Sequence, residues 1–240
     1  IVRAPFSGTT PVFDAAAVVS GTGQVVGPFT NQGLFISDAG GVLELSDIAQ
    51  SASGVIRAAS GSQVRFAGGV FTGGTVDVEP GGMTTANGAS LRALAITGTA
   101  TVPGSSTLAL GDGVLGPGEV FVSGSTADGT GTLQIEHGAT VDVATISLAA
   151  DNSISRARIV RTPFSGATPT FGSSCTVTGY GQVVGPFNNN GLFVSDGAGG
   201  TLSLSDITQG SAGVIRAAAG STINFAGGVF QGGTVDVEPG

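Results

Sequence analysis

The apolar residues of this chain alternate with polar ones in short bursts, and glycine-rich turns separate the bursts. Two successive units show the pattern at their apolar positions: Phe35, Leu43, Leu45 and Ile48, then Ile56, Val64, Phe66 and Val70. Alternation with a period of two is typical of β-strands. The Gly-Gly, Ser-Asp and Pro-Gly pairs between bursts favour turns. Because no stretch combines a helical apolar period with helix caps, the pattern predicts an all-β protein with almost no helix.

Successive units begin at Gly33, Gly54 and Gly74. Short strands repeated in constant phase, at a period of about 20–21 residues, indicate a solenoid in which each turn stacks on the one before. A β-propeller is disfavoured because its blade needs about 40 residues. We therefore predict a single-stranded parallel β-helix, three-sided and right-handed, with about 11 or 12 turns at roughly 4.8 Å each. Residues 82–97 and 119–158 fit the frame less cleanly, which predicts longer loops there.

A second, longer repeat is superimposed on the short one. The stretch "IVRAPFSGTTPVF" from Ile1 returns as "IVRTPFSGATPTF" from Ile159, a spacing of 158 residues. One extra residue enters where "SDAGGV" (37–42) becomes "SDGAGGT" (195–201). We expect residues 1–240 to form one continuous β-solenoid taken from a longer chain, with residues 1–158 as the first long repeat and residues 159–240 as a partial second.

Paired charges provide a test of stacking within the sequence itself. Glu44 and Arg65 occupy the same frame position one turn apart, and their counterparts in the second copy are Ser203 and Asn224. Residues at matching positions become neighbours along the axis of a stacked coil, as cross-strand pairs do in a sheet. The joint loss of both charges therefore predicts an ion pair between Glu44 and Arg65.

Two more axial ion pairs follow from the same frame. Arg57 lies one turn before Asp77, and Arg216 lies one turn before Asp236 in the second copy. Glu79 shares the strand face of Asp77, so that two carboxylates flank one arginine. Such a group resembles the machinery of polysaccharide-cleaving enzymes. Because it occurs twice in identical context, surface ion pairing is the favoured interpretation.

Composition excludes several classes of partner. The 240 residues include sixteen acidic residues and eight arginines without lysine, giving a net charge of -8. Phosphate backbones would be repelled by this charge, so nucleic acid is not expected as a partner. No apolar run reaches the roughly 18 residues of a spanning helix, so no membrane span is expected in this segment.

Few residues suggest catalysis or metal binding. Cys175 and His137 are the single cysteine and histidine, which removes disulfide frameworks and sites built from several such ligands. Ser-Asp pairs end four apolar bursts, at Asp38, Asp47, Asp196 and Asp206. We interpret these pairs as turn caps, with Ca²⁺ binding as a weaker alternative. We predict no catalytic, cofactor-binding or metal residues.

The repeats "GTVDVEPGG", "GVIRAASGSQVRF" and "GTLQIEHGATVDV" resemble in style those of bacterial autotransporter passengers and filamentous-haemagglutinin-like adhesins. The resemblance implies a secreted or surface-displayed β-helical stalk. We therefore expect a non-enzymatic rod in an extracellular or cell-surface fibre or adhesin, which self-associates end to end or laterally or contacts surface glycans or proteins. A polysaccharide lyase or glycoside hydrolase is the alternative, and an ice-binding protein a weaker one.

Overall fold

The computed structural model describes residues 1–2, 8–151, 153–162, 166–196 and 199–239. Within them the chain forms 24 strands and one short 3-10 helix, η1 (Ile154–Arg156), with no α-helix. The extra residue of the second copy falls at residues 197–198, which are outside the described residues. No helix among the described residues is long and apolar enough to span a membrane.

The first half of the chain holds strands β1 (Val12–Phe13), β2 (Val18–Ser20), β3 (Gly23–Asn31), β4 (Leu34–Ser37), β5 (Val42–Gln50), β6 (Val55–Ala58), β7 (Gln63–Thr72), β8 (Thr75–Val78), β9 (Met83–Arg92), β10 (Ala95–Thr97), β11 (Thr99–Val102) and β12 (Thr107–Leu110). The second half holds β13 (Val114–Gly124), β14 (Gly131–Ile135), β15 (Thr140–Ala150), β16 (Ala157–Arg161), β17 (Thr170–Phe171), β18 (Thr176–Asn189), β19 (Leu192–Ser195), β20 (Thr201–Gln209), β21 (Val214–Ala217), β22 (Thr222–Phe225), β23 (Phe230–Gln231) and β24 (Thr234–Val237).

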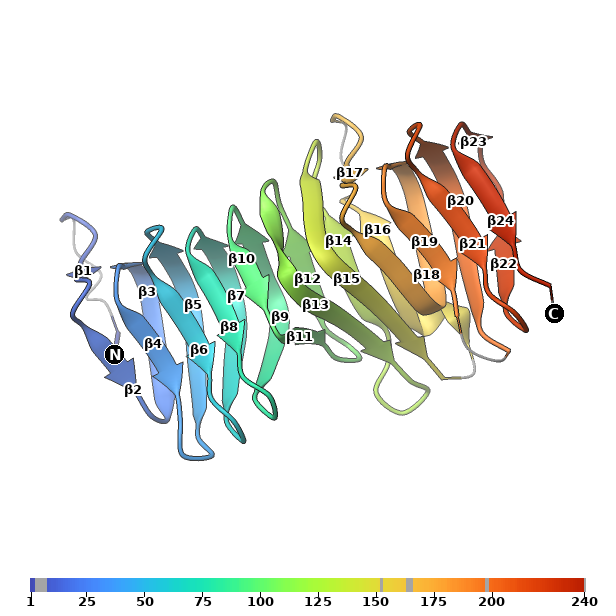
Figure 1. Cartoon of the computed structure of the whole chain (residues 1–240). Coiled ribbons are helices and arrows are strands. Elements are labelled where there is room, and N and C mark those ends of the chain that lie inside the picture. The colour runs from blue at the N-terminus through green and yellow to red at the C-terminus, as the bar shows by residue number, and fades with distance from the viewer. Residues whose placement is uncertain (3–7, 152, 163–165, 197–198, 240) are drawn as a thin grey trace.

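The strands stack into a rod of about 10 turns with about 21 residues per turn, which runs from the N-terminus to the C-terminus in Figure 1. Every pairing between named strands is parallel, and each joins a strand to its equivalent in an adjacent turn, such as Leu43 with Val64 and Val64 with Thr84. The prediction of a parallel β-solenoid is confirmed. At roughly 4.8 Å between stacked strands, the rod is on the order of 50 Å long.

The pairings form three columns of stacked strands, which we call faces I, II and III. Residues 23–26 of β3 begin face I, residues 29–31 of β3 lie on face II, and β4 lies on face III. The chain visits the faces in this order in every turn. Face I continues through the first halves of β5, β7 and β9, then β11, the second halves of β13 and β15, the start of β18, and β19, β21 and β24.

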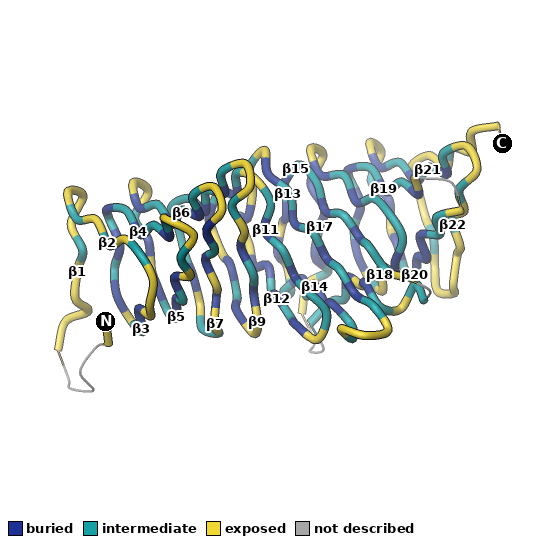
Figure 2. The backbone as a smooth tube through the Cα atoms, turned by 90° about the horizontal axis from the view of Figure 1, so that it is seen from below, coloured by how far each residue is buried: buried dark blue, intermediate teal, exposed yellow. Residues whose placement is uncertain are grey.

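The core runs through the middle of the coil because alternate strand residues point inward. Figure 2 shows buried residues along the strands, and exposed ones at the turns and at both ends. The largest side chains that are fully buried are mainly phenylalanines, including Phe35, Phe66, Phe171 and Phe193. Phe171 packs edge to face against Phe193 with ring centroids 5.1 Å apart. An edge-to-face contact between aromatic rings stabilises the fold by more than the burial of their surface area alone.

Buried asparagines organise one corner of the coil. The Asn31 side chain is inaccessible to solvent; its Oδ1 accepts a hydrogen bond from the Gly33 amide at 3.0 Å, and its Nδ2 donates to Gln50 Oε1 at 3.3 Å. Asn189 repeats the first of these bonds with Gly191 at 3.0 Å. Because a buried amide without partners is costly, these contacts fix the position of the chain at the corner.

The turns lengthen in the middle of the chain. The turn that leads from Ile146 to its stacked partner Val177 is about half as long again as the turn from Leu43 to Val64. The prediction of longer loops is right for residues 119–158 and wrong for residues 82–97. Strand β9 pairs with β7 in regular register, as between Phe71 and Leu91.

The long repeat does not contain a whole number of turns. Face I passes through residues 23–26, 42–45, 63–66, 83–86, 99–102, 119–122, 145–148 and 176–180, which makes seven steps. Val183, the counterpart of Val25, then lies one face further on, where it pairs with Ile159 and Leu204 of face II. The long repeat thus spans seven turns and one third, and equivalent residues of the two copies lie on different faces.

Candidate functional site

A ladder of polar side chains runs along face I of the first copy. Gln24, Glu44 and Arg65 are stacked partners on three successive turns. Gln24 Nε2 donates to Glu44 Oε1 at 2.6 Å, and Arg65 Nη1 lies 3.5 Å from Glu44 Oε2. The Arg65 side chain is 52% exposed and that of Glu44 27%. The longer contact and the exposure of the arginine leave much of the guanidinium accessible to solvent.

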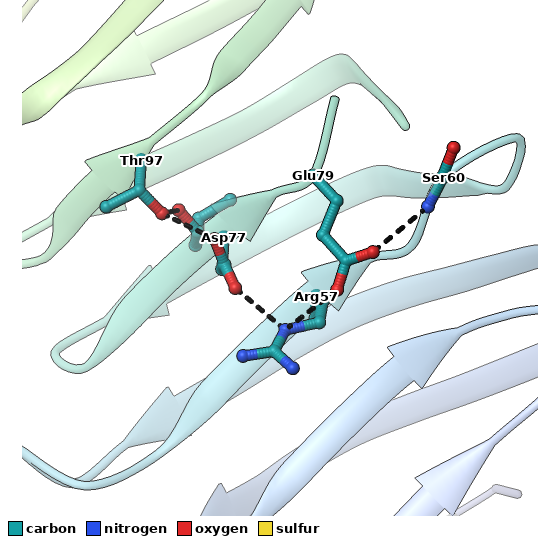
Figure 3. A network of polar contacts seen from close by, with 6 residues as sticks. Arg57, Ser60, Asp77, Glu79 and Thr97 are labelled. Carbon is teal, nitrogen blue, oxygen red and sulfur yellow. Dashed lines mark hydrogen bonds and ion pairs between the residues drawn. The ribbon is translucent and has the colours of Figure 1, made fainter. Parts of the chain in front are cut away.

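A tighter cluster lies on face III (Figure 3). Arg57 Nε on β6 is 2.7 Å from Oδ2 of Asp77, which lies on β8, and 3.8 Å from Oε1 of Glu79, which directly follows β8. Thr97 on β10 donates to the second oxygen of Asp77 at 2.7 Å, and the Ser60 amide donates to Glu79 at 3.3 Å. Every charge of the cluster therefore has a protein partner on an adjacent turn.

The second copy repeats this cluster on another face. Arg216 Nε lies 2.9 Å from Asp236 Oδ2 and 4.0 Å from Glu238 Oε1. Strand β21 belongs to face I because it pairs with β19, whereas β6 belongs to face III. The structure thus brings together all three pairs predicted from the sequence, Glu44 with Arg65, Arg57 with Asp77, and Arg216 with Asp236.

Another ion pair, which the repeat frame does not predict, spans two turns. Arg92 Nη2 lies 2.9 Å from Glu136 Oε1, and Ser90 Oγ donates to the same oxygen at 2.7 Å. Gly111 lies between them: a Cβ there would come within 2.5 Å of Arg92 Cγ and 2.7 Å of Glu136 Oε2. A glycine on the intervening turn thus opens the space for the contact. The signal in the sequence is a glycine flanked in frame by opposite charges.

The Ser-Asp pairs act as turn caps within the coil. Asp47 has a positive φ of 55°, and its Oδ1 accepts the Val70 amide of the next turn at 3.0 Å. Asp206 does the same with Val229 at 3.1 Å, while Ser37 Oγ donates to the Gly41 carbonyl at 2.8 Å. Among the residues that the structure describes, no three His, Cys, Asp or Glu side chains gather in a manner suited to a metal ion.

The single cysteine and histidine are both packed between turns. Burial raises the pKa of Cys175 from 9.0 to about 12, and the charge of Asp142 adds to this effect. A thiol with such a pKa is neutral and unreactive at physiological pH. His137 is half buried, and its Nδ1 accepts a hydrogen bond from Arg161 Nε at 3.1 Å. Neither group has the surroundings of a nucleophile with its base.

A groove of about 470 Å³ opens beside the face I ladder. Its lining is predominantly polar, with Glu44, Arg65, Thr85 and Asn87 among the contributing residues, and Pro103 and Ser106 at one side. It contains one carboxylate and one guanidinium. A typical glycoside hydrolase works with two carboxylates that flank the scissile bond, and the lining of this groove supplies one, Glu44.

These features define the class of the protein as an all-β, parallel β-solenoid rod stabilised by contacts along its axis. No protein-family model matches the sequence, and no curated protein matches it. A solved structure of the TibC-catalysed hyper-glycosylated TibA55-350 fragment is similar over 95% of this chain and 95% of that chain, with 17% sequence identity and a TM-score of 0.21. A likeness at this TM-score supports no further conclusion, so the function proposed below depends on the geometry of this chain.

Proposed function

We propose that this chain is a structural, non-enzymatic rod segment of an extracellular or cell-surface fibre or adhesin. The observation that carries the proposal is the unbroken stacking of three strand columns along the described residues. Each interior turn is hydrogen-bonded to the turns on both sides, as between β4, β6 and β8. Because a repeat coil gains stability from its neighbours, such a chain is suited to spanning distance.

The charged groups support this proposal. The arginines of the axial pairs contact carboxylates on other turns, so their charges are used in contacts along the axis of the rod. The cluster of Arg57, Asp77 and Glu79 occurs again as Arg216, Asp236 and Glu238 with similar distances. A reaction centre is normally a departure from a regular pattern, whereas this cluster is part of the pattern.

The experiment that tests the rod is small-angle X-ray scattering combined with surface display. We expect the scattering of the purified chain to give the cross-section of a single coil and a length on the order of 50 Å, from about 4.8 Å per turn. A chain with a second long repeat appended should lengthen without thickening. A globular distance distribution for either protein would contradict the proposal.

Adhesion requires a separate measurement, because a rod can also serve only as a spacer. Cells or beads that display the chain should adhere to one another or to glycan- or protein-coated surfaces more than those displaying a scrambled-repeat control. Equal adhesion of the two would limit the role to that of a stalk. Release of sugar from polysaccharides by the purified chain would overturn the non-enzymatic assignment.

A further inference from the structure

The charged pair of Glu44 and Arg65 beside the groove differs between the two copies. In the second copy, Ser203 and Asn224 replace these two residues and pair on face II. There Asn224 Nδ2 lies 3.4 Å from Ser203 Oγ. The charged pair of the ladder is thus a feature of the first copy, in contrast to the cluster at Arg57, which occurs in both copies.

A longer corner of the coil, at residues 103–106, forms one wall of the groove. Thr85 pairs with Thr101, and Ala89 pairs with Leu108. The chain between the second members of these pairs is longer than the chain between the first members. The extra length lies in the corner at residues 103–106, and Ser105 Oγ in it donates to the Asp128 carbonyl of the next turn at 2.7 Å. Insertions in a solenoid commonly form its binding face.

The chemistry of the lining indicates the kind of ligand. Glu44 offers acceptors and Arg65 offers donors, and their separation of 3.5 Å is long for a charge-assisted hydrogen bond. A hydroxyl group, which both donates and accepts, satisfies both side chains at once. Asn87 is exposed at the rim, and the exposed Ala67 supplies a small apolar surface in the lining. The volume of about 470 Å³ is within the range of about 300–1,000 Å³ of small-molecule sites.

Charge argues against anionic ligands. The two charges in the lining cancel, and the whole chain carries a net charge of -8, which disfavours the approach of anions. We propose that this groove is a binding site for a short segment of a neutral, polyhydroxylated saccharide. The site goes beyond the rod function, since a rod without it would have the same length and stability.

The second copy supplies the test variant. Glu44→Ser combined with Arg65→Asn installs the residues that this coil already accepts at the equivalent positions, so the fold should be preserved. A second variant, Asn87→Ala, changes the rim and leaves the ladder intact. The matched control is Arg57→Asn combined with Asp77→Ser, which removes a charge pair on face III. Circular dichroism melting verifies that each variant is folded.

The probes are cellotetraose, maltotetraose and trigalacturonate. Their binding is measured by saturation-transfer NMR and by calorimetry. We expect at least one of the two neutral probes to bind the parent chain, with affinity reduced at least tenfold in the Glu44→Ser, Arg65→Asn variant, reduced in Asn87→Ala and unchanged in the face III control. The proposal is overturned if neither neutral probe binds, if the groove variants bind as the parent does, or if trigalacturonate binds most tightly. X-ray scattering on the same samples tests the rod shape separately, so failure of the proposed saccharide site does not imply failure of the proposed rod function.

Discussion

The turns at residues 54–81 and 213–239 have nearly the same sequence but different surroundings. Phe66 and its counterpart Phe225 each make an edge-to-face contact, with Phe71 at 4.7 Å and with Phe230 at 4.6 Å. Yet Phe66 is 1% exposed and Phe225 44% exposed. The difference lies in the turn that stacks on each residue. Ala86 of β9 pairs with Phe66, whereas no described strand stacks on the far side of Phe225. Burial in this protein is therefore a property of the stack rather than of the individual turn.

The largest expected effect comes from truncating this phenylalanine in the two copies. Phe66→Ala should lower the free energy of unfolding by about 3–5 kcal/mol, because it leaves a cavity among turns on both sides. Phe225→Ala should cost less than about 1 kcal/mol, since partly exposed side chains lose little on truncation. Urea denaturation followed by circular dichroism measures both. Equal costs for the two variants would show that the covering turn is irrelevant.

Adding a covering turn next to Phe225 should remove the difference. Appending a copy of residues 82–102 after Gly240 reproduces the segment that covers Phe66 in the first copy. Amide exchange in β22 and β24 should then slow by at least about 100-fold, which corresponds to roughly 2.7 kcal/mol. Hydrogen exchange with mass spectrometry measures it. As a control, a scrambled segment of the same length should leave exchange unchanged, and equal protection by both segments would contradict the stacking account.

Sequence patterns were sufficient for the fold because the same period-two burst recurs on every turn of about 21 residues. The axial pairs could be predicted for the same reason, since Glu44 and Arg65 are one unit apart. The contact between Arg92 and Glu136 depends on two turns and an intervening Gly111. A frame that compares only adjacent units cannot identify it.

The face of the coil on which each residue lies could not be predicted from the repeat pattern either. It depends on the accumulated lengths of the corner loops, and these vary, as at residues 103–106. Pro103 and Ser106 of that corner line the groove beside Glu44, so an alignment of the repeats shows the loss of two charges but not the cavity.

A smaller effect is expected at the turn caps that both copies share. Asp47→Ala should destabilise the protein by about 1–2 kcal/mol, because it removes the acceptor of the Val70 amide and leaves a side chain at positive φ. Asp47→Asn should be nearly neutral, since asparagine accepts the same bond and tolerates that conformation. Thermal melts in CaCl₂ and in EDTA complete the test. A melting temperature that falls in EDTA would favour the Ca²⁺ interpretation.

Cys175 and Ala17, its counterpart, allow another comparison. Because the folded pKa of Cys175 is raised from 9.0 to about 12, folding favours the neutral thiol. This contribution is intact below pH 9 and is lost as the pH rises towards 12, where the unfolded chain already carries a thiolate. Cys175→Ala should remove the loss of stability in this window. Labelling with a thiol reagent at pH 8 should proceed only through opening of the turn, and rapid labelling of the folded chain would contradict the burial.

The smallest effect should come from exchanging the charged ladder for its counterpart. The variant that combines Glu44→Ser with Arg65→Asn should change the free energy of unfolding by less than about 0.5 kcal/mol, because pairs of exposed charges contribute little. Arg65→Asn alone should also be mild, since Glu44 keeps its bond from Gln24 Nε2 at 2.6 Å. A double-mutant cycle in urea at low and high salt measures the coupling between Glu44 and Arg65. A coupling above about 1 kcal/mol would assign the pair to stability and weaken the case for a ligand, whereas a near-zero coupling fits a pair that is free to contact one.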